Sequence, residues 1–199
     1  MSLLVKICGL RNAADVDAAV TAGADAVGFV FAESVRRVMP AEARDAAVGL
    51  SQEVRRVAVM RHPENEEWLA VLNTFAPDVL QTDIDDFEAL DVPHQIERWP
   101  VIRENHPAID QSLPDTFLYE GSNSGLGQTV DWERAAVIAG RGNMILAGGL
   151  SAENVAEAIR TVHPRGVDVS SAVESAPGQK DPDLIRNFIS AARAAENNA

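Results

Sequence analysis

The sequence predicts an α/β protein folded as a single (β/α)8 TIM barrel, and three observations carry that prediction. Short apolar runs typical of strands alternate with stretches whose apolar residues recur at helical spacing. Eight strand-like runs occur, seven of them followed by a helical pattern, which favours a closed barrel of parallel strands. The 199 residues suffice for one domain and require short loops in this fold. A flavodoxin-like open sheet is the structural alternative.

The first half of the chain contains four strand–helix units. Asn12 is expected to cap the first helix, and Pro40 opens the second, at residues 40–50. An apolar stripe that begins at Trp68 predicts the third helix, and a weak pattern at residues 85–90 the fourth. Strands are expected at residues 3–8, 26–31, 55–60 and 79–81.

The second half repeats the alternation with one irregularity. Residues 105–114 hold two prolines and no helical stripe, so the fifth helix is expected to be shortened or irregular. Asp181 and Pro182 supply the cap and first position of a last helix. Strands are expected at residues 95–102, 116–120, 144–147 and 166–169, and helices at residues 132–139, 155–162 and 182–194. The single domain then spans residues 1–199, with a polar tail at about 196–199.

Composition limits the classes of function. A net charge of −13 disfavours binding to nucleic acid, where Lys and Arg must replace counterions around the phosphates. No apolar run is long enough to span a membrane, and the N-terminus lacks the basic region of a signal peptide. One cysteine cannot form an internal disulfide, so the cytoplasm is the expected location.

Polar residues are expected to converge at one end of the barrel. Strand residues alternate between the interior and the helix layer, so if Val5 and Ile7 pack on helices, Lys6 and Cys8 face inward. The same parity turns these residues inward on other strands: Gln81, Asp83, Leu118, Glu120, Asp168 and Ser170. Barrel enzymes place reactive groups at the carboxyl ends of strands, where these side chains would meet.

Small residues after the last strands indicate a phosphate site. Gly148 and Gly149 follow the seventh strand, and Ser170, Ser171 and Ala172 follow the eighth. Backbone N–H groups at these two places commonly bind phosphate in barrel enzymes. A further loop with Gly125 and Gly127 follows the sixth strand. The expected ligand is a small phosphorylated molecule.

Each of these residues also has a purely structural interpretation. Cys8 alone is more often a small core residue, although its place beside Gly9, near Lys6 and Arg11, favours the thiolate. Other side chains have equally simple alternatives: Asp168 as a loop anchor, Glu120 as a solvated strand end, Arg36 and Arg37 as a surface pair, and the glycines as strand ends.

Six segments resemble the phosphoribosylanthranilate isomerase family in order and spacing along essentially the whole chain. They are Lys-Ile-Cys-Gly at 6–9, Gly-Phe-Val-Phe at 28–31, Ser-Val-Arg-Arg-Val at 34–38, Leu-Ala-Gly-Gly-Leu at 146–150, Gly-Val-Asp-Val-Ser-Ser-Ala-Val-Glu at 166–174 and Pro-Gly-Gln-Lys-Asp at 177–181. The resemblance implies the Amadori rearrangement of N-(5′-phosphoribosyl)anthranilate in tryptophan biosynthesis.

The resemblance also implies roles for matching residues. Cys8 would be the general base, with a pKa lowered toward working pH, and Arg36 would meet the anthranilate carboxylate. Further substrate contacts would come from Lys6, Gln81, Gly127, Gly148, Gly149, Ser170, Ser171 and Ala172. The resemblance implies no metal or organic cofactor. Nothing in the sequence identifies a protein partner, although other tryptophan-pathway enzymes are the candidates that the resemblance implies.

The sequence departs from the family pattern in four places. Glu120 stands where the family has an aspartate that acts as the general acid, and Ala172 replaces a common glycine. The loop after the sixth strand reads Ser-Gly-Leu-Gly at 124–127, and the fourth strand ends Gln-Thr-Asp-Ile at 81–84 rather than Gln-Leu-His-Gly. Glu120 is the first candidate for the acid, and Asp168 and Asp83 are the reserves.

Two other functions stay open. One is a related isomerase barrel of histidine biosynthesis, or an enzyme that serves both pathways. That family resembles a two-fold repeated barrel with paired carboxylates, whereas Cys8 stands where the first carboxylate would be. The other is a non-catalytic barrel that binds a phosphosugar or serves as a scaffold.

Overall fold

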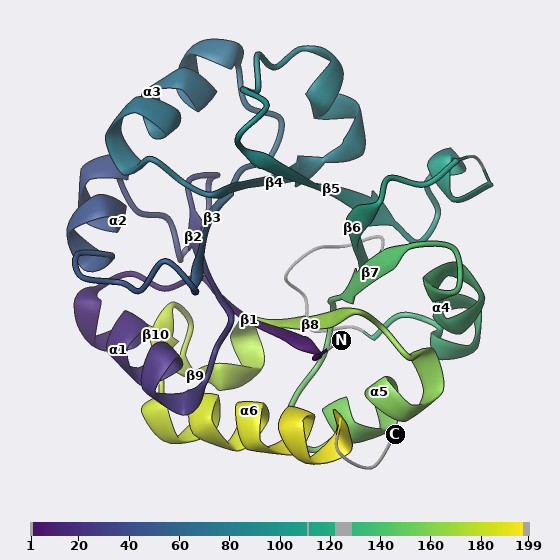
Figure 1. Ribbon diagram of the computed structural model, residues 1–199. Helices are drawn as coiled ribbons and strands as arrows, with labels where there is room; N and C mark the ends of the chain where they lie inside the picture. Colours follow the sequence, from purple (N-terminus) through teal and green to yellow (C-terminus); the bar gives the residue numbers. More distant parts are fainter. Residues whose placement is uncertain (1, 111, 122–128, 197–199) are drawn as a thin grey trace.

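A computed structural model describes residues 2–110, 112–121 and 129–196 of the chain. Eight parallel strands close into a barrel in sequence order, so the open-sheet alternative is wrong (Figure 1). The barrel closes where β8 pairs with β1, with Lys6 opposite Asp168 in the register. The strands are β1 (Leu4–Cys8), β2 (Ala26–Val30), β3 (Arg55–Val59), β4 (Val79–Asp83), β5 (Glu97–Arg103), β6 (Thr116–Glu120), β7 (Asn143–Leu146) and β8 (Gly166–Val169).

Helices surround the barrel (Figure 1). The α-helices are α1 (Ala13–Ala22), α2 (Pro40–Ala46), α3 (Asn65–Phe75), α4 (Trp132–Ala139), α5 (Val155–Val162) and α6 (Pro182–Glu196). Both predicted caps are confirmed: Asn12 accepts from the Asp15 N–H at 3.0 Å, and Asp181 accepts from Leu184 at 3.1 Å. Helix α6 extends two residues beyond its predicted end at residue 194, to Glu196.

Two connections are short 3-10 turns instead of α-helices. The predicted fourth helix is the turn η1 (Ile84–Glu88), and the irregular fifth is η2 (Pro107–Asp110). The prediction of an α-helix after the fourth strand was therefore wrong. Strand β4 extends two residues further than predicted, to Asp83, which leaves a short segment better suited to a 3-10 turn.

A small hairpin between β8 and α6 was not predicted. A 3-10 turn, η3 (Ser171–Val173), leads into β9 (Glu174–Ala176), which pairs antiparallel with β10 (Gln179–Lys180). Gly178 at the turn has a φ of 76°, and a Cβ there would lie 2.7 Å from the Val35 carbonyl oxygen. Glycine thus lets the hairpin approach the loop after β2, which brings Glu174 and Lys180 to the barrel mouth.

Strand residues divide between two hydrophobic clusters in the predicted alternation. The interior cluster includes Ala26, Val57, Trp99, Leu118 and Ile145, whereas Val5, Ile7, Leu80, Tyr119 and Val167 belong to the larger cluster under the helices. The predicted inward direction of Lys6, Cys8, Gln81 and Leu118 follows from this parity and is confirmed. Among the described residues, no helix is long and apolar enough to span a membrane.

Candidate active site

Lys6, Cys8 and Asp168 form a buried polar group at the seam between β1 and β8. The Lys6 Nζ lies 2.7 Å from Asp168 Oδ1, and the Lys6 side chain is fully buried. The Lys6 chain and the Cys8 sulfur lie side by side against Gly28. Burial by itself lowers the pKa of Lys6, but Asp168 and Cys8 raise it more, so the ammonium is retained.

The pKa of the Cys8 thiol is shifted upward, whereas a downward shift was expected. Burial raises its pKa, and the nearby cations Lys6 and Lys180 only partly oppose this effect. This direction is opposite to the lowered pKa that the resemblance implies. Arg11, expected to assist the thiolate, instead donates to the Gly178 carbonyl.

Arg36 is part of a charged network instead of a free surface pair. Its Nε and Nη2 donate to the two Glu174 carboxylate oxygens at 2.7 and 2.9 Å. Lys180 donates to Glu174 at 2.7 Å and to the Ser170 carbonyl at 2.8 Å. Burial by itself raises the pKa of Glu174, but bonds from Arg36, Lys180 and the Gly178 N–H lower it to about 2. Glu174 therefore stays ionised and holds the guanidinium in one orientation.

Two glycines make room for these side chains. A Cβ at Gly28 would lie 3.0 Å from Cys8 Sγ and 3.1 Å from Lys6 Cε. A Cβ at Gly9 would lie 2.6 Å from Arg36 Cδ. Both glycines belong to the segments that resemble the family, and the structure supplies a steric reason for each.

Arg103, Asp83 and Glu120 form a second charged group at the ends of β5, β4 and β6. Arg103 Nη1 lies 2.7 Å from Glu120 Oε1, and its Nη2 lies 2.8 Å from Asp83 Oδ1. All three side chains are at least four-fifths buried, with exposed fractions of 20%, 14% and 16% for Arg103, Asp83 and Glu120. Glu120 therefore forms an ion pair at the barrel mouth and is not a solvated strand end.

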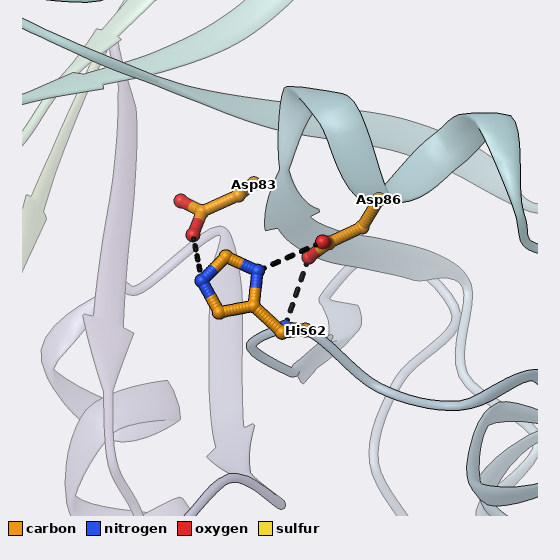
Figure 2. Close-up of side chains that lie close together, drawn as sticks. All are labelled: His62, Asp83 and Asp86. Carbon is orange, nitrogen blue, oxygen red and sulfur yellow. Dashed lines mark hydrogen bonds and ion pairs between the residues drawn. The ribbon is translucent and has the colours of Figure 1, made fainter.

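His62 extends this group toward the surface (Figure 2). Its Nε2 lies 3.3 Å from Asp83 Oδ2, and its Nδ1 lies 2.9 Å from Asp86 Oδ1. The three residues have ligand types that suit a metal ion. However, the two ring nitrogens point at different carboxylates, and one ion binds only one of them. The geometry therefore favours a hydrogen-bonded link over a cation site.

Gln81 has an unsatisfied acceptor inside the barrel. The residue is 6% exposed, and its Oε1 has no hydrogen-bond partner in the described part of the chain. Buried polar atoms in native proteins usually have partners. This side chain is therefore available to a ligand that donates a hydrogen bond.

The predicted phosphate loops follow neighbouring strands, because β7 pairs with β8. Gly148 and Gly149 have φ values of 87° and 62°, a conformation that favours glycine. Ser170 donates to the Cys8 carbonyl oxygen at 3.0 Å, whereas Ser171 and Ala172 are exposed in η3. Within the described ranges, no hydrogen bond uses the N–H groups of Gly148, Gly149, Ser171 or Ala172. Gly127 lies outside the described residues.

A cavity of about 700 Å³ opens at the other end of the barrel. Its lining includes Leu4, Glu97, Thr116 and Asn143, which begin or nearly begin their strands. The sites of barrel enzymes lie at the carboxyl ends, so this cavity is not the substrate site.

Sequence reasoning gave no role to Arg103, His62, Glu174 or Lys180. The inward direction of Arg103 could have been predicted, because it lies two residues after Val101 on the same strand and Val101 faces the barrel interior. Glu174 and Lys180 stood inside the family-like segments, but their contact depends on the hairpin. His62 lies in a loop before Pro63, where no strand or helix periodicity predicts the direction of its side chain.

A closed parallel barrel with ionisable side chains and glycine-rich loops at the carboxyl ends of its strands defines a (β/α)8-barrel enzyme. Comparison with known proteins narrows this class. The family model for N-(5′-phosphoribosyl)anthranilate (PRA) isomerase matches residues 5–191. The chain therefore belongs to the phosphoribosylanthranilate isomerase family.

Individual relatives agree with this assignment. The N-(5′-phosphoribosyl)anthranilate isomerase of Listeria welshimeri is 36% identical over 98% of this chain and 100% of its own length. The enzyme of Pelobacter propionicus is 40% identical over 95% of both chains. The crystal structure from Thermotoga maritima has a TM-score of 0.86 and 33% identity, covering 97% of this chain and 100% of that one.

Proposed function

We propose that this protein isomerises N-(5′-phosphoribosyl)anthranilate to 1-(2-carboxyphenylamino)-1-deoxyribulose 5-phosphate in tryptophan biosynthesis, with Cys8 as base and Glu120 as acid. One observation carries the proposal: the buried Lys6–Cys8–Asp168 group lies in a barrel whose family is defined by this reaction. A related isomerase was solved with reduced 1-(o-carboxyphenylamino)-1-deoxyribulose 5-phosphate, and it has a TM-score of 0.83 and 33% identity to this chain.

The reaction needs two proton transfers, one by Glu120 at the end of β6 and one by Cys8 at the end of β1. Glu120 gives a proton to the furanose ring oxygen, the C–O bond breaks toward that oxygen, and the nitrogen lone pair completes a Schiff base. Cys8 then takes the proton from sugar C2. The positive charge of Lys6 beside the Cys8 sulfur stabilises the thiolate that must form first. The Lys6–Asp168 ion pair keeps that ammonium in place.

Other residues hold the two anionic ends of the substrate. Glu174 occupies two donors of Arg36, and the remaining Nη1 edge is directed to the anthranilate carboxylate. The loops after β7 and β8 supply backbone N–H groups for the sugar phosphate. Gln81 offers its buried acceptor to a sugar hydroxyl. The enzyme works in the cytoplasm, and its protein partners, if any, are other tryptophan-pathway enzymes.

Loss of anthranilate fluorescence from freshly made substrate tests the proposal. The assay compares the parent, Cys8→Ala and Glu120→Gln, with Glu157→Gln on the exposed face of α5 as control. Loss of roughly a hundredfold or more in both site variants, with an unchanged control, supports the acid–base pair. Loss in Cys8→Ala alone would move the acid to Asp168 or Asp83.

A folded parent without activity would contradict the proposed reaction. The histidine-pathway aminoimidazole substrate would then be assayed, and turnover of that compound alone would identify the related isomerase. Binding of a phosphosugar without turnover of either compound would favour the scaffold alternative.

A further inference from the structure

We propose that Arg103 is a positioning residue for the Glu120 carboxyl group, and that Asp83 positions Arg103 in turn. The inference rests on the proposed function, because it concerns the acid of that reaction. It assigns a purpose to the charged group that replaces the family's usual residues at the ends of β4 and β6.

The strand order places Arg103 between its two partners. Arg103 is the last residue of β5, which pairs with β4 on one side and β6 on the other. It stands opposite Glu120 in the register, and Asp83 stands opposite Val101, two residues earlier on β5. The guanidinium bonds Glu120 through Nη1 and Asp83 through Nη2, so it is held from both sides.

Asp83 is itself held from outside the barrel. Its second oxygen faces His62, whose ring also bonds Asp86 (Figure 2). Asp86 accepts further bonds from the His62 N–H at 3.0 Å and the Thr82 hydroxyl at 2.5 Å. A chain of contacts thus runs from the exposed His62 to Glu120, and each carboxylate in it has a defined orientation.

The chemistry of Glu120 explains why such support is useful. A glutamate has one more rotatable bond than the family's aspartate, so it needs more restraint to present its carboxyl group in one place. In the ion pair with Arg103, Glu120 is a carboxylate, so it takes up a proton from solvent before it can give one to the ring oxygen. Arg103 contributes by holding the carboxyl group in one place for that proton transfer.

A double-mutant cycle on kcat tests the inference. We expect Arg103→Met to lower kcat roughly 10–100-fold with KM changed less than about threefold, because the acid is misplaced while substrate contacts remain. Arg103→Met/Glu120→Gln should be no slower than Glu120→Gln alone. Arg103→Lys should recover part of the loss, and Asp83→Asn should lower kcat only while Arg103 is present.

Controls separate this inference from the proposed function. Arg44→Met removes an exposed arginine of α2 and should keep parental kcat and KM. Circular dichroism and urea midpoints identify unfolded variants, and Arg103→Gln replaces Arg103→Met if the latter does not fold. Parental turnover with an unchanged kcat in folded Arg103→Met or Arg103→Gln, or losses that multiply in the double variant, would overturn the inference alone. Absence of turnover by the parent would overturn both.

Discussion

Lys6 and Asp168 face each other across the seam of the barrel, with 2.7 Å between the lysine Nζ and the aspartate Oδ1. They are opposed in the register of β1 and β8, although 162 positions separate them in the chain. The contact therefore forms only when the barrel closes, and it places a buried cation beside the Cys8 sulfur.

Removal of one partner of this pair should be more harmful than removal of both. Asp168→Ala leaves the Lys6 charge buried and unpaired, and we expect a loss of about 3–5 kcal/mol in the free energy of unfolding. Lys6→Met/Asp168→Leu should lose less, since no buried charge remains. Urea denaturation measures both. A double variant less stable than Asp168→Ala would contradict the ion-pair explanation.

Alkylation of Cys8 should become faster as pH rises above neutrality. The thiolate is the form that reacts with iodoacetamide, and burial raises the pKa of the Cys8 thiol above its ordinary value of 9.0. The sequence has one cysteine, so the alkylation rate reports this side chain directly, and it should still increase as pH rises from 7 through 9.0. An alkylation rate that no longer changes with pH near neutrality would show that the thiol ionises more readily than its burial indicates.

Glu174 should make stability depend on pH in acid. A carboxyl pKa lowered from 4.5 to about 2 contributes stability that is present above pH 4.5 and is lost as pH falls toward 2. The contribution is about 3 kcal/mol. Glu174→Gln should therefore differ most from the parent above pH 4.5 and converge with it near pH 2. Glu157→Gln is the exposed control, and an equal difference at all pH values would exclude the mechanism.

Gly28→Ala tests the space around the base. The added methyl would lie 3.0 Å from Cys8 Sγ and 3.1 Å from Lys6 Cε, so one side chain must move. A displaced base should reduce kcat roughly tenfold or more while the protein stays folded. Gly140→Ala meets nothing closer than 3.6 Å and should keep parental kcat. Equal kinetics for both variants would show that the site tolerates the methyl group.

Gln81→Leu should separate substrate affinity from stability. No donor in residues 2–110, 112–121 and 129–196 reaches the buried Gln81 Oε1 atom, so its removal breaks no hydrogen bond within that part of the protein. We expect an unchanged or higher urea midpoint together with a KM raised roughly tenfold, because the substrate loses its acceptor. Gln81→Leu with parental KM would exclude this contact, whatever its stability.

The barrel and much of its polar mouth could be predicted from local patterns. Period-two alternation in strands such as residues 3–8 identified which side chains face inward, since pleating reverses direction at every residue. The N-terminal caps of α1 and α6 were equally local, because a cap bonds N–H groups two or three residues away. Fold class, family and the inward placement of Lys6 and Cys8 were therefore all accessible to the sequence.

Tertiary structure decided the partners of those residues. Arg36 pairs with Glu174, and Arg103 with Glu120 and Asp83, through strand neighbours and a hairpin distant in the chain. The pKa of Cys8 was also decided by tertiary structure. The sequence shows cations near Cys8, but closure of the barrel determines how completely water is excluded from the thiol. Burial and charge pairing act through space, so they follow from packing and not from sequence spacing.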